Sequence, residues 1–241
     1  MNSIALTGRL SGRFVPREAL DAHRKSSMLL LLRSHFTGVD RETFDADLLQ
    51  KNWVILLEDQ RGVLRGFSTL LVYPETIAGR ALTVVYSGDT IVAREWWGSP
   101  VLPLTWLRAV RQLTPLYGNR EVYWLLLTSG FRTYRFLPVF FREFFPRWDG
   151  ASAADRSVMQ SLAATQFGGR YDGKTGIVRL ERPQVLAPEL LDVPARRALD
   201  PHVAFFLERN PGYVYGDELV CLARIAEENL TAAGLRIAKA L

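Results

Sequence analysis

The feature that most constrains the fold of this chain is a β-rich run that ends in a tight turn and continues directly as an amphipathic helix. The run covers residues 82–92, and the turn Trp-Trp-Gly-Ser-Pro follows at residues 96–100. The free N–H groups of a first helical turn and the helix dipole both favour negative charge at such a junction. The pattern therefore predicts either a plain strand-to-helix connection or a site for an anion such as a phosphate.

Two helices and two strands are predicted upstream of this junction. Pro16 suits a first helical turn, and apolar residues recur at helical spacing as far as Leu32. Asp40, followed by early acids, predicts the cap of a second helix. Two apolar runs at 52–59 and 64–74 then flank a turn that contains glycine, which is typical of an antiparallel hairpin.

Composition excludes several classes of protein. With 48% hydrophobic residues the chain can bury a sizeable core, and no repeat of fixed period is visible. The single cysteine, Cys221, excludes a disulfide framework and a cysteine-based metal site. Residues 1–14 lack the apolar core of a signal peptide, and the longest apolar runs are too short to span a bilayer, so we expect a cytoplasmic protein. The net charge of +5 favours an acidic partner or a phosphate-bearing ligand, or reflects a scattered solvated surface.

The order of two helices, an antiparallel meander, and a strand, turn and helix resembles the GNAT (GCN5-related N-acetyltransferase) superfamily. The resemblance is clearest over residues 19–147, and residues 170–181 and 217–225 can supply the last two strands. It implies an α+β, three-layer fold with a mixed, mostly antiparallel twisted sheet, flanking helices and a C-terminal extension. We expect a GNAT-like core at residues 1–150. Residues 151–241 are expected to complete the sheet and add an irregular wrapping segment and terminal helices.

The turn departs from the family pattern in ways that matter chemically. In that family the fourth strand ends in V-x-P-x-Y-R-G-x-G-I-G, whose backbone amides hold the diphosphate of acyl-CoA. Residues 92–102 overlay this pattern without a gap, and Gly98 matches a family glycine. The basic position is Trp97, and the later glycines are Pro100 and Leu102. Proline lacks an amide donor and leucine adds a side chain where phosphate oxygens would lie, so we expect an altered diphosphate site.

Residues 134–148 carry large aromatic side chains at i, i+3 and i+4 spacing, which favours a buried helix. A channel for a long acyl chain and a short interfacial helix are the alternatives. Family members often carry N-x-x-A-x-x-L-Y here, and the tyrosine that often serves as general acid is replaced by Phe141. Residues 149–157 are rich in Gly, Ala, Ser and Asp and predict a loop or soft boundary.

The chemistry that the resemblance implies is acyl transfer from a pantetheine thioester to an amine, with the pantetheine arm lying between two strands that splay apart. The corresponding strands are residues 82–92 and 122–128. The amine must lose a proton and the thiolate can take one up, so a carboxylate and a phenol are required. The candidate catalytic residues are Asp89 as base, Tyr86 or Tyr134 as acid, and Glu95 as a further base. The candidate cofactor-binding residues are Ile91, Val92, Trp97, Gly98, Ser99, Ser129 and Arg132. For Asp89, the alternative is a turn or bulge residue beside Gly88.

Three functions stay open at this point. The first is an N-acyltransferase with a relaxed diphosphate site, whose donor is an acyl carrier protein, and the second is an acyl-CoA enzyme with an unusual loop. The third is a non-catalytic GNAT-like binding or regulatory module, which the replacements at Trp97, Pro100 and Phe141 favour. The expected co-substrate is an acyl-CoA or acyl-pantetheine thioester, with a small-molecule amine as acceptor and no metal. Neither a nucleic acid nor a membrane span is expected, and the sequence leaves the oligomeric state open.

Overall fold

A computed structural model describes residues 9–118, 120–150 and 153–240 of the chain. Its strands are β1 (Ser11–Pro16), β2 (Phe36–Thr37), β3 (Trp53–Glu58), β4 (Leu64–Ile77), β5 (Arg80–Val92), β6 (Glu121–Thr128), β7 (Tyr171–Asp172), β8 (Ile177–Val178), β9 (Val185–Leu186) and β10 (Glu218–Arg224). Its α-helices are α1 (Ala22–Arg33), α2 (Arg41–Leu49), α3 (Val101–Leu113), α4 (Phe131–Tyr134), α5 (Phe136–Phe140), α6 (Ala153–Phe167), α7 (Pro188–Leu191), α8 (Ala195–Ala198), α9 (Pro201–Arg209) and α10 (Ala232–Lys239).

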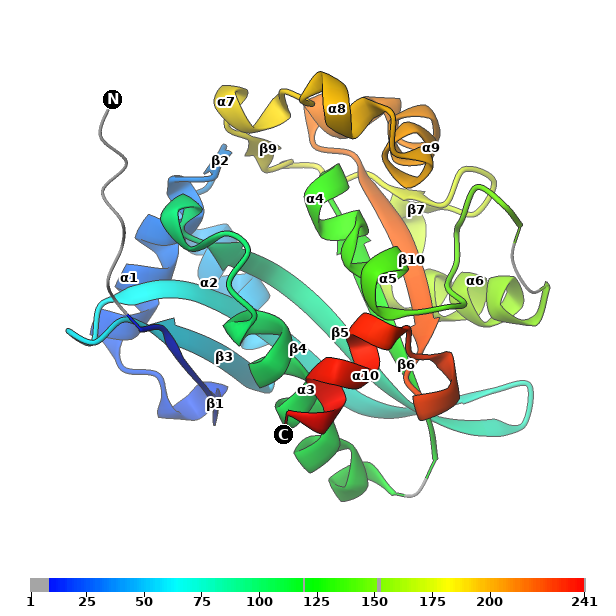
Figure 1. Cartoon of the computed structure of the whole chain (residues 1–241), viewed down its shortest axis with the longest axis horizontal. Coiled ribbons are helices and arrows are strands. Elements are labelled where there is room, and N and C mark those ends of the chain that lie inside the picture. Colours follow the sequence, from blue (N-terminus) through cyan, green and yellow to red (C-terminus); the bar gives the residue numbers. More distant parts are fainter. Residues whose placement is uncertain (1–8, 119, 151–152, 241) are drawn as a thin grey trace.

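Eight of the strands form one mixed, mostly antiparallel sheet in the order β1-β3-β4-β5-β6-β10-β8-β7, and helices cover both of its faces (Figure 1). This arrangement confirms the α+β fold class predicted from the sequence. Strands from both the first 150 residues and the remainder lie in this one sheet. The first eight residues, which are part of the segment without a signal-peptide core, lie outside the described residues. Within the described part, no helix is long and apolar enough to cross a membrane.

The N-terminal segment differs from its prediction. The chain around Pro16, predicted to begin a helix, forms strand β1, which pairs antiparallel with β3. Helix α1 begins only at Ala22, because the carboxylate of Asp21 caps it by accepting the N–H of Arg24 at 2.7 Å. Since β1 is an edge strand and Pro16 is its last residue, the missing N–H of proline interrupts little of the ladder.

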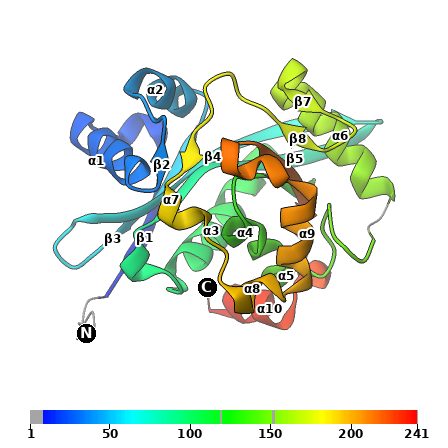
Figure 2. The same cartoon turned by 90° about the horizontal axis from the view of Figure 1, so that it is seen from above.

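The sheet separates two helical layers. Successive residues of a strand point to opposite faces. Val84 and Tyr86 pack in the apolar cluster that contains α6, whereas Val85 packs in the cluster that contains α3. Figure 2 shows α1, α2 and α6 on one side of the sheet and α3, α5 and α10 on the other. We call these sides the α6 face and the α3 face.

β5 and β6 are parallel neighbours for only part of their length. Their pairing ends at Ser87 of β5 and Leu126 of β6. β5 continues along β4 to Val92, whereas Thr128 of β6 pairs with β10. The two strands therefore part beyond Ser87, as the resemblance implies for the fourth and fifth strands of the GNAT fold.

A β-bulge in β5 lies where the strands part. Gly88 and Asp89 together lie opposite the single residue Thr69 of β4, which confirms the interpretation of Asp89 as a bulge residue. A Cβ at position 88 would lie 2.6 Å from Oγ1 of Thr69 and 2.7 Å from Cε of Lys51, so glycine is required there. Because a bulge re-aims the side chains of its strand, it also gives Asp89 a direction that regular pleating would not.

The aromatic segment 134–148 is buried in part, with Trp148 exposed, and it is not one helix. It contains only the end of α4 and all of α5, since Pro138 has no N–H to continue the helical ladder from one to the other. Its buried members are Tyr134, Leu137, Phe141, Phe144 and Phe145. The loop predicted at 149–157 is also wrong in part, because helix α6 begins at Ala153.

The segment between β8 and β10 wraps around the sheet. Its strand β9 pairs with β2, and the N–H of Ala187 donates to the carbonyl of His35 at 2.8 Å. On the other side, a Cβ at Gly130 would lie 3.0 Å from Cδ1 of Leu186, so β9 also packs against the turn that follows β6. The β2–β9 pair thus connects the half of the sheet that ends with β5 to the half that begins with β6, at the end where these two strands have parted.

Candidate functional site

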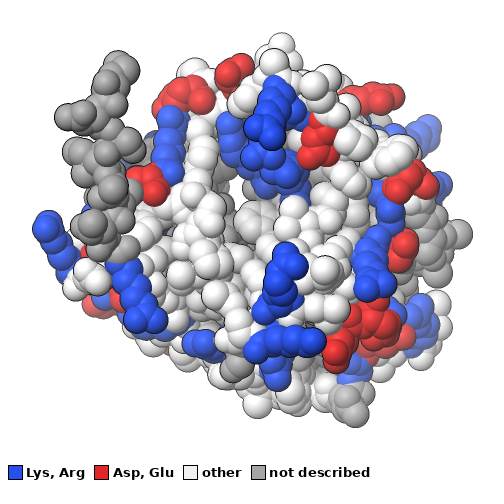
Figure 3. Space-filling model, in the orientation of Figure 1, with Lys and Arg blue, Asp and Glu red and all other residues white. Residues whose placement is uncertain are grey.

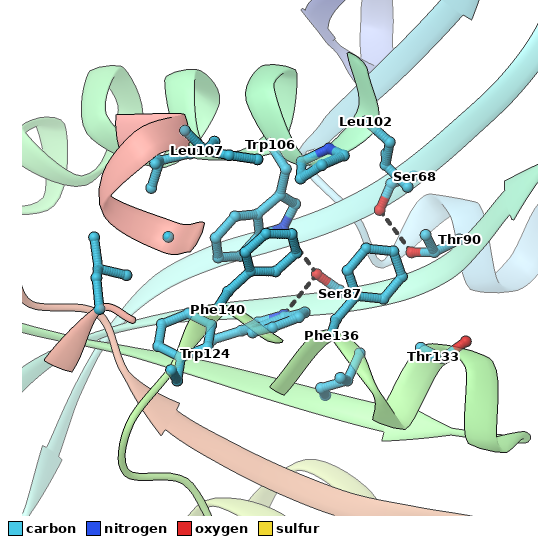
Figure 4. A pocket seen from close by; sticks show the side chains of 16 residues that line it. Ser68, Ser87, Thr90, Leu102, Trp106, Leu107, Trp124, Thr133, Phe136 and Phe140 are labelled. Atoms are coloured by element: carbon cyan, nitrogen blue, oxygen red, sulfur yellow. Dashed lines mark hydrogen bonds between the residues drawn. The ribbon is translucent and has the colours of Figure 1, made fainter. Parts of the chain in front are cut away.

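On the α3 face, a narrow apolar cavity of about 60 Å³ lies beside the gap between β5 and β6 (Figure 4). Its walls come from β5, β6, α3, α5 and α10, with principal lining residues Ser87, Trp106, Trp124, Phe136, Phe140 and Ile237. The centre of this face is uncharged, and Lys and Arg side chains lie around it together with several Asp and Glu side chains (Figure 3). The cavity therefore suits an apolar group whose remainder carries negative charge.

Ser87 is the polar centre of the cavity. Its Oγ accepts the indole N–H of Trp124 at 2.9 Å and that of Trp106 at 3.2 Å, and Figure 4 draws both bonds. The two indole rings lie against each other with centroids 4.7 Å apart. Because a serine hydroxyl has two acceptor lone pairs and one hydrogen, these two bonds leave the hydrogen of Ser87 to be donated.

A group of polar side chains lies on the α6 face, where the same strands part. We call it the acidic cluster, and its members are Asp47, Lys51, Tyr86, Asp89, Ser129 and Glu218. Nζ of Lys51 lies 2.6 Å from Oδ1 of Asp47 and 5.3 Å from the ring centroid of Tyr86. Ser129 donates to Oε1 of Glu218 at 2.5 Å. The Lys51 ammonium thus pairs with Asp47 and acts on Asp89 and Glu218 only through its charge.

Burial and mutual repulsion change the proton affinities in the acidic cluster. Desolvation, followed by repulsion from Asp47, raises the pKa of Asp89 to about 7, although Lys51 opposes this shift. Desolvation also raises the pKa of Glu218, and it raises the pKa of the Tyr86 phenol well above its usual value. Asp89 can therefore gain or lose a proton near neutral pH, whereas Tyr86 keeps its proton.

Thr69 adds an unpaired hydroxyl beside the acidic cluster. Its side chain is buried, and Oγ1 has no hydrogen-bond partner within the described chain. The close approach of Gly88 to both Thr69 and Lys51 places this hydroxyl next to the ammonium group. An unpaired buried hydroxyl is unfavourable by about 1–3 kcal/mol, so a polar group that reached Thr69 would relieve this cost.

The turn between β5 and α3 offers few amide donors. Pro100 and Pro103 have no N–H, and the amide of Val101 is directed to Oγ of Ser99 at 3.3 Å. Among residues 100–103, only Leu102 has a backbone amide that is not directed to Ser99. The anion site that the strand-to-helix junction would offer is correspondingly reduced, and Pro103 strengthens the departure already visible at Pro100.

Several candidate cofactor-binding residues hold the protein's own loops. The carbonyl of Val92 accepts the indole N–H of Trp97 at 2.8 Å, and Nε2 of His35 lies 3.0 Å from the same oxygen. The guanidinium of Arg132 lies 5.1 Å from the Trp97 ring centroid and donates to the carbonyl of Leu190 at 2.8 Å. Gly98 turns the chain with φ of +88°, a value that favours glycine. These contacts close the far end of the gap with side chains.

Three further candidates lie away from the gap. Tyr134 is fully buried, its hydroxyl donates to the carbonyl of Pro146 at 2.8 Å, and burial raises its pKa. Ile91 packs in the apolar cluster that contains α1 and α2. Glu95 lies 3.3 Å from Arg65 in a surface ion pair. The structure thus brings Tyr86, Asp89 and Ser129 together. Tyr134, Ile91 and Glu95 are not part of that group.

The sequence analysis did not select four residues that the structure adds to the site. Asp47 and Lys51 carry a recognisable signal, because opposite charges four residues apart on a helix often pair. Glu218 is the first residue of β10 and Thr69 lies within β4, and neither has a local pattern that marks it. Only the tertiary fold brings the four to Asp89.

No protein-family model and no curated protein matches the chain. Three similar solved structures are the GNAT family N-acetyltransferase YhbS from Escherichia coli in complex with CoA, AAC(6')-Iy in complex with a bisubstrate analog, and a probable N-acyltransferase from Enterococcus faecalis V583. Their identities are 15%, 16% and 11%, with TM-scores of 0.40, 0.38 and 0.42. The matches cover 53%, 48% and 92% of this chain and 68%, 78% and 66% of those chains. In this chain, the strand order and the parting of β5 from β6 confirm the GNAT resemblance at the level of the fold.

Proposed function

We propose that this protein is an N-acyltransferase, which moves an acyl group from a pantetheine thioester to a small-molecule amine. The observation that carries the proposal is the gap between β5 and β6, with an apolar cavity on one face and the acidic cluster on the other. The two substrates match these two surfaces. The acyl thioester is apolar and suits the cavity, whereas the amine is cationic before it reacts and suits the acidic cluster. The carboxyl group of Asp89, raised in pKa where the strands part, supports a base for this reaction.

On the donor side, the acyl group lies in the cavity against Trp106 and Phe140. The hydroxyl of Ser87 then donates to the thioester carbonyl. This hydrogen bond strengthens as the carbonyl oxygen acquires negative charge in the transition state. Ser87 is an effective donor at that step because the two indole groups hold its hydroxyl in place.

On the acceptor side, the acidic cluster attracts the ammonium form of the amine. Asp89, ionised above pH 7, removes a proton, and the amine nitrogen attacks the carbonyl carbon. As the carbon–sulfur bond breaks, the nitrogen loses its second proton and the thiolate takes one up, so an amide and a free thiol form and the proton held by Asp89 passes to solvent. Tyr86, the protonated phenol of the acidic cluster, is a candidate to relay a proton to the thiolate and to regain one from the nitrogen.

The donor is an acyl-CoA or an acyl group on a carrier protein, and the two share the pantetheine arm. The turn before α3 has few backbone amides that could bind a diphosphate. We therefore infer that the pantetheine arm supplies most of the binding free energy of the acyl donor. The cationic rim around the cavity attracts either donor, because both are anionic. Acyl-pantetheine, which lacks the nucleotide, is then expected to have a KM within about fivefold of that of acyl-CoA.

The experiment measures thiol release from acetyl and octanoyl thioesters of CoA and pantetheine, in the presence of a panel of small amines. We expect amine-dependent release in the wild type and a fall in kcat of about 100-fold in Ser87→Ala, in line with the loss of an oxyanion donor. Ser11→Ala is the matched control, because it also removes a serine hydroxyl, on the exposed edge strand β1 outside the gap. Melting curves of each variant establish that it is folded. Absence of amine-dependent release with every donor, together with no donor-induced change in melting temperature, would refute the proposal.

A further inference from the structure

We propose that the chain has a second ligand site, for a small phosphate-bearing molecule, in a basic pocket at the β7–β8 edge of the sheet. The pocket has a volume of about 340 Å³, which is in the range of small-molecule sites. It is lined by α6, the β7–β8 turn, α9 and residues 145–147, and Figure 1 shows these helices and β7 together at the edge opposite β1. None of its lining residues lines the cavity beside Ser87.

The charges that line this pocket are all positive. They belong to Arg147, Arg156, Lys174 and Arg209, and the described lining includes no carboxylate. Arg147 is neutralised by Asp149 and by a second acid, Glu143. The other three cations form no ion pair with any described residue of the chain. Three like charges that converge on one hollow repel one another, and an anion would relieve that repulsion.

The contacts of these cations hold them at the pocket without neutralising them. The guanidinium of Arg156 lies 5.3 Å from the ring centroid of Phe145. Arg209 donates to the backbone carbonyl of Lys174 at 3.3 Å, which ties α9 to the β7–β8 turn. Arg156 and Arg209 therefore have defined places, and both keep their charge for a ligand.

Tyr171 adds an unpaired hydroxyl next to the pocket. The residue lines the pocket, but its hydroxyl is shielded from solvent and has no hydrogen-bond partner in the described part of the protein. Burial raises the pKa of this phenol, so it keeps its proton. A phosphate oxygen would be an acceptor for this proton once the hydroxyl turns into the pocket.

The wall of the pocket also determines which phosphate compound fits. A phosphomonoester carries close to two negative charges, which suits three unpaired cations better than a carboxylate does. Phe145 and Phe205 add an apolar surface to the pocket, and inorganic phosphate is too small and too polar to cover it. A flat apolar group attached to the phosphate, such as a nucleoside, would cover it, so AMP is the probe of choice.

The test compares melting temperatures in the presence of inorganic phosphate, AMP and adenosine at constant ionic strength. We expect both phosphates to raise the melting temperature of the wild type, AMP at the lower concentration, and adenosine to have no effect. The shift should disappear in the double variant Lys174→Ala/Arg209→Ala and persist in Arg61→Ala, which removes an exposed arginine from the β3–β4 turn. Because the double variant lies outside the transfer site, its amine-dependent thiol release should stay within twofold of the wild type.

Three outcomes would overturn the inference. One is the absence of any shift at 10 mM AMP or phosphate, a concentration at which a weak site of about 1 mM is well occupied. The second is a shift that survives in the double variant, which would assign the binding to the donor site instead. The third is binding of a single-stranded oligonucleotide without binding of AMP, which would replace the small molecule with a nucleic acid. None of these depends on whether the protein transfers acyl groups.

Discussion

The substitution Asp89→Asn tests the electrostatics of the acidic cluster without any knowledge of the substrates. Asp89 is half-buried, and desolvation and the neighbouring Asp47 raise its pKa from 3.8 to about 7. A carboxyl group with a raised pKa in the folded state makes that state less stable as the pH rises, since the unfolded chain ionises more easily. This cost is absent below about pH 4 and is fully present above about pH 7. Asparagine has the same shape and no charge to bury.

The magnitude follows from the shift. A difference of about three pKa units corresponds to about 4 kcal/mol at most, at 1.36 kcal/mol for each unit. Partial exposure of Asp89 to solvent reduces this to about 2 kcal/mol. For a chain of this size, that stabilisation corresponds to a melting temperature higher by about 4–8 °C.

The assay is thermal unfolding of wild type and D89N, followed by circular dichroism at pH 4.5 and pH 8. We expect the variant to melt higher than the wild type at pH 8 and to keep only about a quarter of that advantage at pH 4.5. The same variant should lose amine-dependent transfer, because the base is gone. The reasoning fails if D89N melts lower than the wild type at pH 8, or if the difference between the two proteins is the same at both pH values.

The other predictions concern the same region. Gly88→Ala should destabilise the protein by about 2 kcal/mol, measured by urea unfolding, because the added Cβ overlaps its neighbours; an unchanged unfolding midpoint would contradict the bulge geometry. The kcat/KM for transfer should rise as the pH increases through about 7, and Asp47→Asn should move this rise to lower pH, because it removes a repelling charge and frees Lys51; a rise that stays in place would exclude Asp89 as the base. Tyr134→Phe should lower stability by about 1 kcal/mol through loss of its bond to Pro146 and leave kcat unchanged, whereas a large fall in kcat would restore Tyr134 as the acid.

The parts of the fold that were predictable from the sequence are those fixed by local patterns. The hairpin of β3 and β4, the strand, turn and helix around Gly98, and the capped start of α2 each follow from neighbours along the chain. β1 was missed because it is a short edge strand in a polar segment with only partial burial. The aromatic segment was predicted as one helix because its spacing is helical, but Pro138 interrupts the backbone ladder.

The candidate site was less predictable than the fold, and for a physical reason. Asp89 and Tyr86 lie on a strand whose role the resemblance supplied, so they were selected. Asp47 and Glu218 come from elements more than 150 residues apart, and only tertiary packing brings them to the same carboxyl group. The position of Trp97 was equally hard to predict, because its indole donates to the carbonyl of Val92, in the part of β5 that no longer pairs with β6.

The small β2–β9 pair has a consequence for how an acceptor could reach the gap. It connects the ends of the two diverging strands, so the gap is bounded at its far end as well as at Ser87. In the proposed transfer an acceptor would therefore approach from one face of the sheet and not along the strands from their far end. An acceptor that is part of a polymer would have to present a projecting amine.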